Sequence, residues 1–236
     1  MRDLFTNPLP TWLRVKGEDD NIVLSSRVRL ARNIDKIPFP NIATSEQLNE
    51  VKEKVISAGQ ALGSEFYEVV ELDNLIALER NVLVEKHLIS TNHIKNPEKR
   101  AVLIRNDDAV SIMINEEDHL RIQGMTPGLN LKEALKLAND VDDLLEQNMD
   151  VAFNEHMGYL TSCPTNLGTG LRASVMVHLP GLVATKQINQ IINAAPQLGL
   201  AVRGLYGEGT ETTGNILQIS NQLTLGYTEI EIIDNL

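Results

Sequence analysis

Apolar residues recur along the chain with two spacings, which predict two kinds of element. Thr44-Ser45-Glu46-Gln47 has the form of a helix capping box, and an apolar stripe at helical spacing follows it to about Leu62. The same spacing predicts helices over residues 74–88, 130–147 and 181–195. Alternating or strand-like runs predict strands over residues 21–30, 66–72, 101–105, 109–115, 172–179, 200–205 and 215–220.

The order of these elements indicates the fold class. Several strands follow one another directly, and there is no regular strand-helix-strand rhythm. An α+β fold with a mostly antiparallel sheet flanked by helices is therefore expected. No repeat, low-complexity tract or linker divides the chain, so we expect residues 1–236 to form a single domain.

Composition narrows the classes of function. The chain has 236 residues, 42% of them hydrophobic, and a formal charge of -11 with a pI near 4.9, which argues against general nucleic-acid binding. Its single cysteine excludes an intramolecular disulfide. The N-terminus has no apolar run of signal-peptide length, and the apolar stretch 173–184 is broken by His178 and Pro180. We therefore expect a cytoplasmic protein without a membrane contact.

Two arginines in the first predicted strand are candidates for binding phosphate. In Ser25-Ser26-Arg27-Val28-Arg29, a period of two places Arg27 and Arg29 on one face. Guanidinium groups bind phosphate oxygens through paired, charge-assisted hydrogen bonds. The alternative is a solvated strand face, because charged residues are mostly exposed.

An acidic segment with one arginine follows the strand at residues 109–115. It reads Asn115-Glu116-Glu117-Asp118-His119-Leu120-Arg121. The guanidinium group stays protonated at neutral pH, so phosphorylating it requires a carboxylate that orients the group and takes a proton. A solvated acidic turn is the alternative.

Two further segments combine glycines with an arginine. Residues 161–172 hold Cys163, two glycines and Arg172, and glycines let the backbone approach phosphates closely. Cys163 by itself fits an inert buried thiol as well as a functional one. The segment 202–209 offers Arg203 and Glu208 on a glycine-flanked loop, which suits a lid or an ordinary hairpin loop.

These four segments, in this order, closely resemble the ATP:guanido phosphotransferases, and specifically their bacterial protein-arginine kinase branch. The resemblance covers nearly the whole chain. It implies the catalytic-domain fold of that family, Mg2+ and ATP, and transfer of the ATP γ-phosphoryl to a guanidinium nitrogen of arginine in proteins. No metal ligand is assigned among the protein's own side chains.

The resemblance also implies roles for particular residues. Glu117 matches the catalytic glutamate, Glu208 the second carboxylate that grips the substrate, and Cys163 the reactive cysteine. The positions that match nucleotide-binding segments are Ser25, Ser26, Arg27, Val28, Arg29, His87, Arg121, Arg172, Ala173, Ser174, Val175, Met176, Arg203, Gly204, Leu205, Tyr206, Gly207 and Glu208. Met176 departs from the pattern, because some members that act on small substrates have a histidine there.

Small-substrate members of the family carry a helical N-terminal domain that encloses the guanidino compound, whereas about twenty residues precede the first arginine motif here. A protein substrate is therefore expected. The alternatives are a phosphagen kinase for free arginine or another small guanidine, and a nucleotide-binding regulatory module that needs a further region or an activator. The residues at 228–236 look like the opening of a helix that continues in longer relatives. By resemblance, the partners are a heat-shock repressor as substrate, a zinc-binding activator protein and a Clp-type protease, in a stress response.

Overall fold

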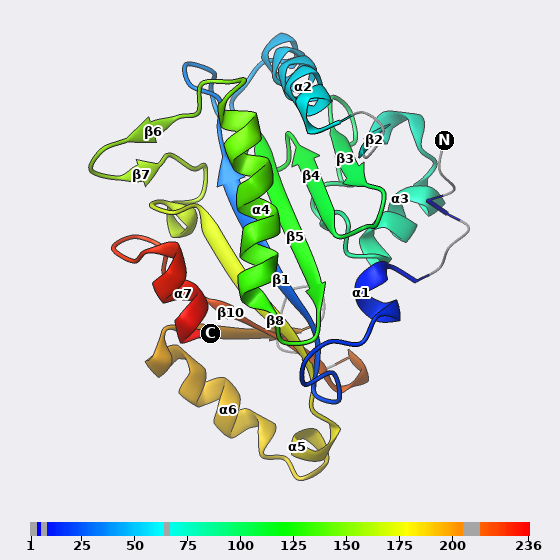
Figure 1. The fold of residues 1–236 in the computed structure, drawn as a ribbon, viewed down its shortest axis with the longest axis vertical. Helices are drawn as coiled ribbons and strands as arrows, with labels where there is room; N and C mark the ends of the chain where they lie inside the picture. The colour runs from blue at the N-terminus through cyan, green and yellow to red at the C-terminus, as the bar shows by residue number, and fades with distance from the viewer. Residues whose placement is uncertain (1–3, 6–8, 64–66, 205–212) are drawn as a thin grey trace.

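The computed structural model describes residues 4–5, 9–63, 67–204 and 213–236, and its central element is an antiparallel eight-stranded sheet. The strand order is β2-β3-β4-β5-β1-β8-β10-β9 (Figure 1). The strands are β1 (Val23–Arg32), β2 (Tyr67–Glu71), β3 (Ala101–Arg105), β4 (Val110–Ile114), β5 (Leu120–Pro127), β8 (Leu171–His178), β9 (Leu200–Gly204) and β10 (Ile216–Asn221). A separate hairpin is formed by β6 (Phe153–Asn154) and β7 (Gly158–Tyr159).

The helices flank this sheet, as expected for the predicted α+β class. They are α1 (Thr11–Arg14), α2 (Ser45–Gly59), α3 (Ala77–Glu85), α4 (Leu131–Glu146), α5 (Pro180–Ala184), α6 (Ile188–Ala194) and α7 (Glu229–Asn235). Short 3-10 turns lie at Gln60–Leu62, Leu72–Asn74, Pro164–Asn166, Ala195–Leu198 and Thr213–Asn215. The fold-class prediction is confirmed.

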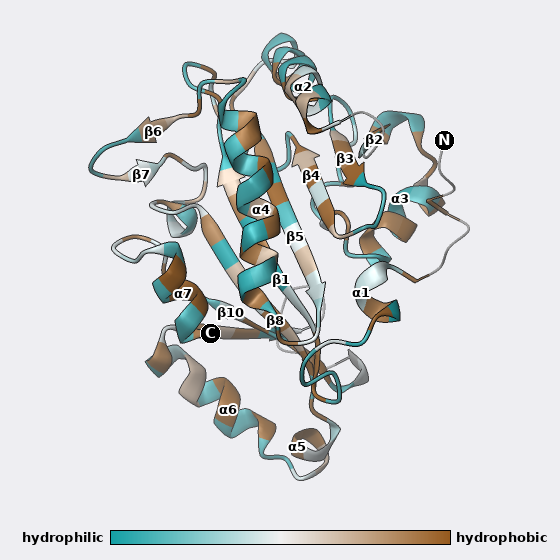
Figure 2. Ribbon diagram, in the orientation of Figure 1, coloured by the Kyte–Doolittle hydropathy of each residue, from teal (hydrophilic) through white to brown (hydrophobic). Residues whose placement is uncertain are grey.

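Helix α4 lies along strands β5 and β1 and covers one face of the sheet (Figure 1). Its buried side is apolar, with Leu135, Ala138 and Val141 in the main core, while polar residues follow its outward side (Figure 2). Gly124 in β5 allows this contact, because a Cβ there would lie 2.4 Å from the Ala134 carbonyl oxygen. Gly124 therefore lies on the sheet face that α4 covers, and the main hydrophobic core lies between this face and the helix.

Several elements differ from the sequence prediction. The helix predicted over residues 181–195 is two helices, α5 and α6, because Lys186 between them has a φ of 58°. The helix predicted over 74–88 is only α3, preceded by a 3-10 turn and ended before His87, whose φ is 57°. Strand β5, the β6–β7 hairpin and α1 were not predicted. The helix at the end of the chain was, and Thr228 caps α7 with Glu231.

Candidate active site

A cavity of about 380 Å³ opens on the sheet face opposite α4. Its lining combines five arginines with two glutamates and a set of small or neutral residues. These residues are Arg27, Arg29, Ala31, Ser90, Thr91, Asn92, Glu116, Glu117, Arg121, Cys163, Thr165, Asn166, Gly170, Arg172, Arg203, Gln218 and Ser220. The cavity thus joins all four segments that the sequence singled out.

Strand register is the reason that the arginines meet. Arg29 in β1 is paired directly with Arg172 in β8, and Ala31 with Arg121 in β5. Directly paired residues of antiparallel strands project to the same face. Val28 pairs with Gly124, which faces α4, so the neighbouring Arg27 and Arg29 point the other way. Arg27 and Arg29 therefore lie on the same face of the sheet, as their spacing predicted, and both line the cavity.

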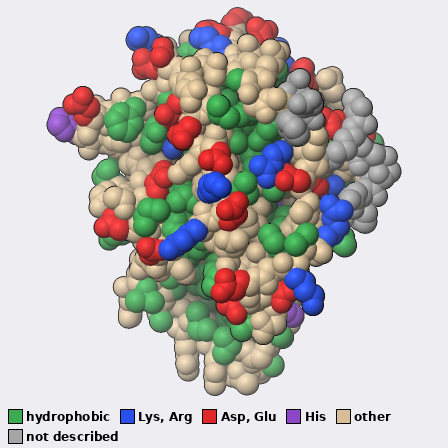
Figure 3. Space-filling model, in the orientation of Figure 1, with side chains coloured by type: hydrophobic (Ala, Val, Ile, Leu, Met, Phe, Trp, Pro, Cys, Tyr) green, Lys and Arg blue, Asp and Glu red, His purple; other side chains and the backbone are tan. Residues whose placement is uncertain are grey.

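The helix-side surface has a different character. Figure 3 shows acidic and basic side chains interspersed over the face that carries α4, as on an ordinary solvated surface. The arginines of the cavity lie on the other side of the sheet, and positive charge is in excess among the residues that line the cavity.

The cavity has more positive than negative charge. Counting its lining gives five arginines against two glutamates, a formal excess of three positive charges. Burial, followed by the nearby charges of Arg121 and Arg172, lowers the pKa of Arg27 to about 10. Burial and the neighbouring guanidinium groups lower the pKa of Arg29 as well. Such crowding is costly without an anion, so the site is suited to a polyphosphate.

Existing contacts already hold some of these arginines in place. Arg27 donates to the Gln218 side-chain oxygen at 2.7 Å, and Arg172 donates to the Asn221 carbonyl at 3.3 Å. The buried Nε of Arg29 has no hydrogen-bond partner in the described part of the chain. An unpaired buried donor is unfavourable, and a phosphate oxygen is an acceptor that would satisfy it.

Arg121 is gripped by both glutamates. Its Nη1 lies 2.7 Å from Glu116 Oε2, and its Nη2 lies 2.9 Å from Glu117 Oε2. The Glu116 side chain is only 2% exposed, whereas that of Glu117 is 40% exposed. Glu116 is therefore a buried anchor, and Glu117 is the carboxylate that an incoming group can reach.

Further bonds fix Glu116 itself. Ser90 Oγ donates to Glu116 Oε1 at 2.8 Å, and the Glu117 backbone N–H donates to Glu116 Oε2 at 3.0 Å. Although burial opposes ionisation, Arg121 first, with Ser90 and the Glu117 amide, holds the pKa of Glu116 below its usual value. Neither Glu116 nor Ser90 was predicted as a site residue. The tandem glutamates were a signal for Glu116, but nothing in the sequence marked Ser90.

Cys163 lies within the loop between β7 and β8, just before the 3-10 turn Pro164–Asn166. Its Sγ lies 3.1 Å from Thr165 Oγ1, and the Thr224 hydroxyl donates to the carbonyl oxygens of Thr165 and Leu167. The loop ends at Gly170, whose φ is +66° and whose carbonyl accepts from Ala31. The half-buried thiol therefore faces the arginines from a loop that is fixed at both ends.

His87 lies behind the cavity and not on its lining. It is buried, its ring packs edge-on against Trp12 with centroids 5.6 Å apart, and its carbonyl accepts from Gln123. Burial, followed by the charges of Arg27 and Arg29, lowers its pKa to about 3. It is therefore neutral near physiological pH.

Other residues of the predicted nucleotide set also stay off the lining. Val28, Ala173 and Val175 belong to the core on the α4 side, and Met176 packs with Trp12 and Met125. The set also includes Ser25, Ser26, Ser174 and Gly204, which are buried in their strands and do not line the cavity. Leu205, Tyr206, Gly207 and Glu208 lie outside the described residues.

Comparison with known proteins defines the class. A family model, the ATP:guanido phosphotransferase C-terminal catalytic domain, matches residues 47–236. The chain belongs to this family of ATP-dependent guanidino phosphotransferases. Within the family, it is 54% identical to the protein-arginine kinase of Desulforamulus reducens over 100% of this chain and 67% of that protein. It is also 50% identical to the protein-arginine kinase of Bacillus subtilis over 100% of this chain and 66% of that protein.

Solved structures agree. The duplicated taurocyamine kinase of Schistosoma mansoni with bound transition-state-analogue components superposes with a TM-score of 0.85 and 28% identity, over 96% of this chain and 34% of that chain. Lombricine kinase gives a TM-score of 0.78 and 29% identity, over 92% and 64%. The predicted family, fold and enzyme class, an ATP-dependent arginine phosphotransferase, are thereby confirmed.

The chain spans about two thirds of the curated relatives' length. Among the residues described, none of the helices is long and apolar enough to cross a membrane.

Proposed function

We propose that this protein transfers the γ-phosphoryl group of ATP to a guanidinium nitrogen of arginine side chains in proteins. One observation carries the proposal: a single cavity brings five arginines together with an accessible glutamate, Glu117. The arginines suit the phosphates, and the carboxylate suits a cationic acceptor. The names of the similar protein-arginine kinases support a protein acceptor.

Glu117 is proposed to bind the guanidinium group that accepts the phosphoryl group. Its carboxylate is bonded to the guanidinium of Arg121 at 2.9 Å, so the site already accommodates a guanidinium in that place. An acceptor guanidinium bound to Glu117 would be oriented by the carboxylate, which takes the proton that leaves the attacking nitrogen. Glu208, outside the described residues, is proposed to hold the other side of the acceptor.

The five arginines are proposed to hold the phosphates. Those of β1 and β8, Arg27, Arg29 and Arg172, are rigidly placed by strand pairing, and Arg121 is placed by Glu116. They would neutralise the charge that spreads over the transferred group in a loose transition state. Bound magnesium, carried on the phosphates, would supply further neutralisation. The remaining nucleotide contacts assigned by resemblance, including His87, are part of this proposal.

Cys163 is proposed as a positioning and electrostatic residue. Its sulfur lies on the cavity beside Arg172 and has no role as a covalent nucleophile in this scheme. We also propose that residues 1–236 act as one catalytic domain in the cytoplasm. The heat-shock repressor, the zinc-binding activator and the Clp-type protease are proposed partners within a stress response.

The test is incubation with Mg2+ and ATP of an arginine-rich protein and, separately, of free L-arginine. Mass spectrometry under conditions that preserve acid-labile phosphoramidates identifies the product. Phosphoarginine on the protein, absent with Glu117→Gln, is expected. Phosphorylation of free arginine instead would make the protein a phosphagen kinase, and ATP binding without transfer to either would make it a regulatory module.

A further inference from the structure

Two asparagines lie on the lining of the cavity without an assigned role. Asn92 comes from the segment between α3 and β3, and Asn166 from the loop between β7 and β8 that also holds Cys163. Asn92 is exposed and Asn166 half-buried. They belong to two segments, 90–92 and 163–166, which we call the mouth segments.

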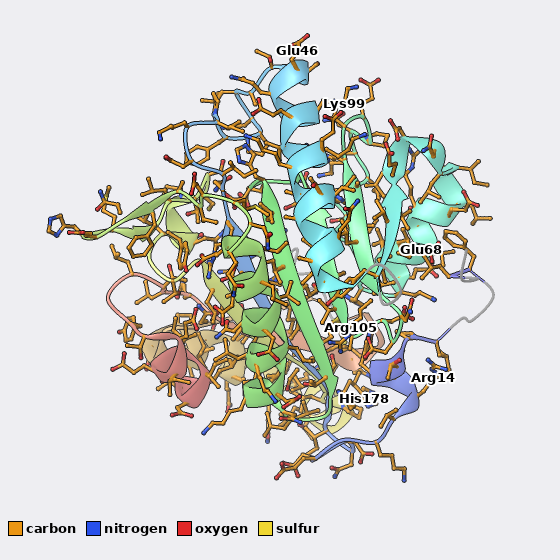
Figure 4. All side chains as sticks on the ribbon, turned by 45° about the horizontal axis from the view of Figure 1, so that its top comes forward. Arg14, Glu46, Glu68, Lys99, Arg105 and His178 are labelled. Carbon is orange, nitrogen blue, oxygen red and sulfur yellow. The ribbon has the colours of Figure 1, made fainter. Side chains whose placement is uncertain are left out.

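The first mouth segment is anchored to Glu116, the buried carboxylate that holds Arg121. Ser90 donates to Glu116, and the His93 backbone N–H donates to Ser90 Oγ at 3.0 Å. Arg100 donates to the carbonyl oxygens of Asn92 at 2.7 Å and of His93 at 3.1 Å. Figure 4 shows Lys99, the neighbour of Arg100, beside helix α2, and the Asn115 side chain donates to the carbonyl oxygens of both Lys99 and Leu48 of α2.

The second mouth segment is anchored in the same manner. The Asn166 backbone N–H donates to the Cys163 carbonyl at 3.0 Å, and Thr224 holds the carbonyl of Thr165. In both segments some backbone groups already have partners within the protein, among them the Asn92 carbonyl and the Asn166 N–H. Within the described part of the chain, no hydrogen bond involves the side-chain amide of Asn92 or of Asn166. The backbone that carries these amides is anchored, and the amides themselves remain available for a ligand.

The charged side chains of the cavity lining lie outside the two mouth segments. Among the described residues, every charged lining group is one of the five arginines or of the two glutamates already assigned to phosphate and guanidinium. The mouth segments contribute only neutral side chains. An arginine whose guanidinium lies on Glu117 has its main chain farther out, because a methylene stem separates the two.

We propose that Asn92 and Asn166 bind the main chain flanking the arginine that is phosphorylated, so that the site selects arginine within a polypeptide. This inference rests on the proposed function. A primary amide offers both a donor and an acceptor, which match the C=O and N–H groups of a peptide without reading its sequence. Free arginine instead carries an ammonium and a carboxylate, which would lose water at a neutral mouth without gaining counter-charges.

The test compares a capped peptide containing one arginine with free L-arginine, in kinetics and in binding. The wild-type protein should use the capped peptide with a kcat/KM about ten- to a hundredfold higher, the product of two hydrogen-bond effects of three- to tenfold each. Asn92→Ala and Asn166→Ala should each raise the KM for the peptide about three- to tenfold, the effect of losing one hydrogen bond. Asn41→Ala, an exposed asparagine off the cavity lining, is the matched control and should leave that KM unchanged.

A gain of function sharpens the test. Asn92→Asp should improve kcat/KM for free arginine, whose ammonium would gain a counter-charge, and worsen it for the capped peptide. The proposal is overturned if both alanine variants keep the wild-type KM for the peptide, or if the wild-type protein uses the free amino acid equally well.

Peptide affinity is measured in parallel with a non-hydrolysable ATP analogue. Asparagine-dependent peptide binding without any phosphoryl transfer would refute the proposed function and keep this inference. Transfer to the peptide without asparagine dependence would do the reverse.

Discussion

Replacing Arg121 by alanine should separate its role in catalysis from its role in stability. The Arg121 side chain is 12% exposed and bonded at 2.7 Å to Glu116, which is 2% exposed. Removing one partner of a buried ion pair typically costs about 3–5 kcal/mol, because the other charge stays buried without compensation. Among the described residues, Glu116 would keep the hydrogen bonds from the Ser90 hydroxyl and the Glu117 amide and lose its ion pair. Turnover should also fall by about 10³-fold or more, which corresponds to about 4 kcal/mol of transition-state stabilisation.

A second substitution distinguishes the two losses. Arg121→Ala combined with Glu116→Gln removes the uncompensated charge, so urea unfolding should show most of the lost free energy recovered. Turnover, measured as phosphoarginine formed, should stay at the level of the single variant. A double variant as unstable as Arg121→Ala would refute the account of Glu116, and an Arg121→Ala protein with near-normal turnover would refute the phosphate role.

The pH dependence of stability gives an independent check on the same pair. The pKa of Glu116 is depressed in the folded protein from an ordinary value of 4.5. A depressed carboxyl pKa contributes stability that is present above the unfolded pKa and is lost as pH falls through the folded pKa. The stability gap between wild type and Arg121→Ala should therefore narrow when the pH falls below about 4.5. A gap independent of pH would contradict the ion-pair explanation.

Three further predictions concern the surrounding structure. Burial lowers the pKa of His119 from 6.5 to about 4, so the neutral ring is favoured in the folded protein. The contribution of His119 to the free energy of unfolding is therefore present above pH 6.5 and is lost as pH falls towards 4, by up to about 1.4 kcal/mol per pH unit. His119→Gln should flatten this pH dependence in urea unfolding measured at several pH values, and an unchanged slope would exclude His119 as its source. Gly170→Ala would place a Cβ 2.6 Å from the Ala31 carbonyl oxygen, at a backbone φ of +66°. The free energy of unfolding should therefore fall by about 2–4 kcal/mol. A melting temperature equal to that of the wild type would show that the loop can move to accommodate the Cβ. Cys163→Ser should lower turnover by only about tenfold, or roughly 1.4 kcal/mol, with no phosphocysteine found by mass spectrometry of the wild-type protein during turnover.

Some elements were predictable because their signals are local. Thr44 caps α2 through the predicted reciprocal bonds with Gln47, and β3 spans the same residues as the predicted strand. Capping and alternation depend on neighbours a few residues away, so the sequence contains all the necessary information.

Other elements were set by distant contacts. Strand β5 contains Gly124 and ends at Pro127, which weaken a strand signal, yet Gly124 is required because α4 lies against it. The break between α5 and α6 depends on the positive φ of Lys186, and helical spacing of apolar residues continues across it. Periodicity does not reveal either feature.

The sequence by itself determined the chemistry available to this protein: which residues are arginines, which carboxylates stand beside Arg121, and which family the motifs resemble. Only the tertiary structure decided how that chemistry is divided. Strand register places Arg29 beside Arg172 and turns Val28 and Ala173 into the core, although all of these belong to the same motifs. Burial makes Glu116 an anchor and leaves Glu117 accessible. Two adjacent glutamates are chemically identical in a sequence, and they acquire different roles only from the dielectric and the partners that folding gives each of them.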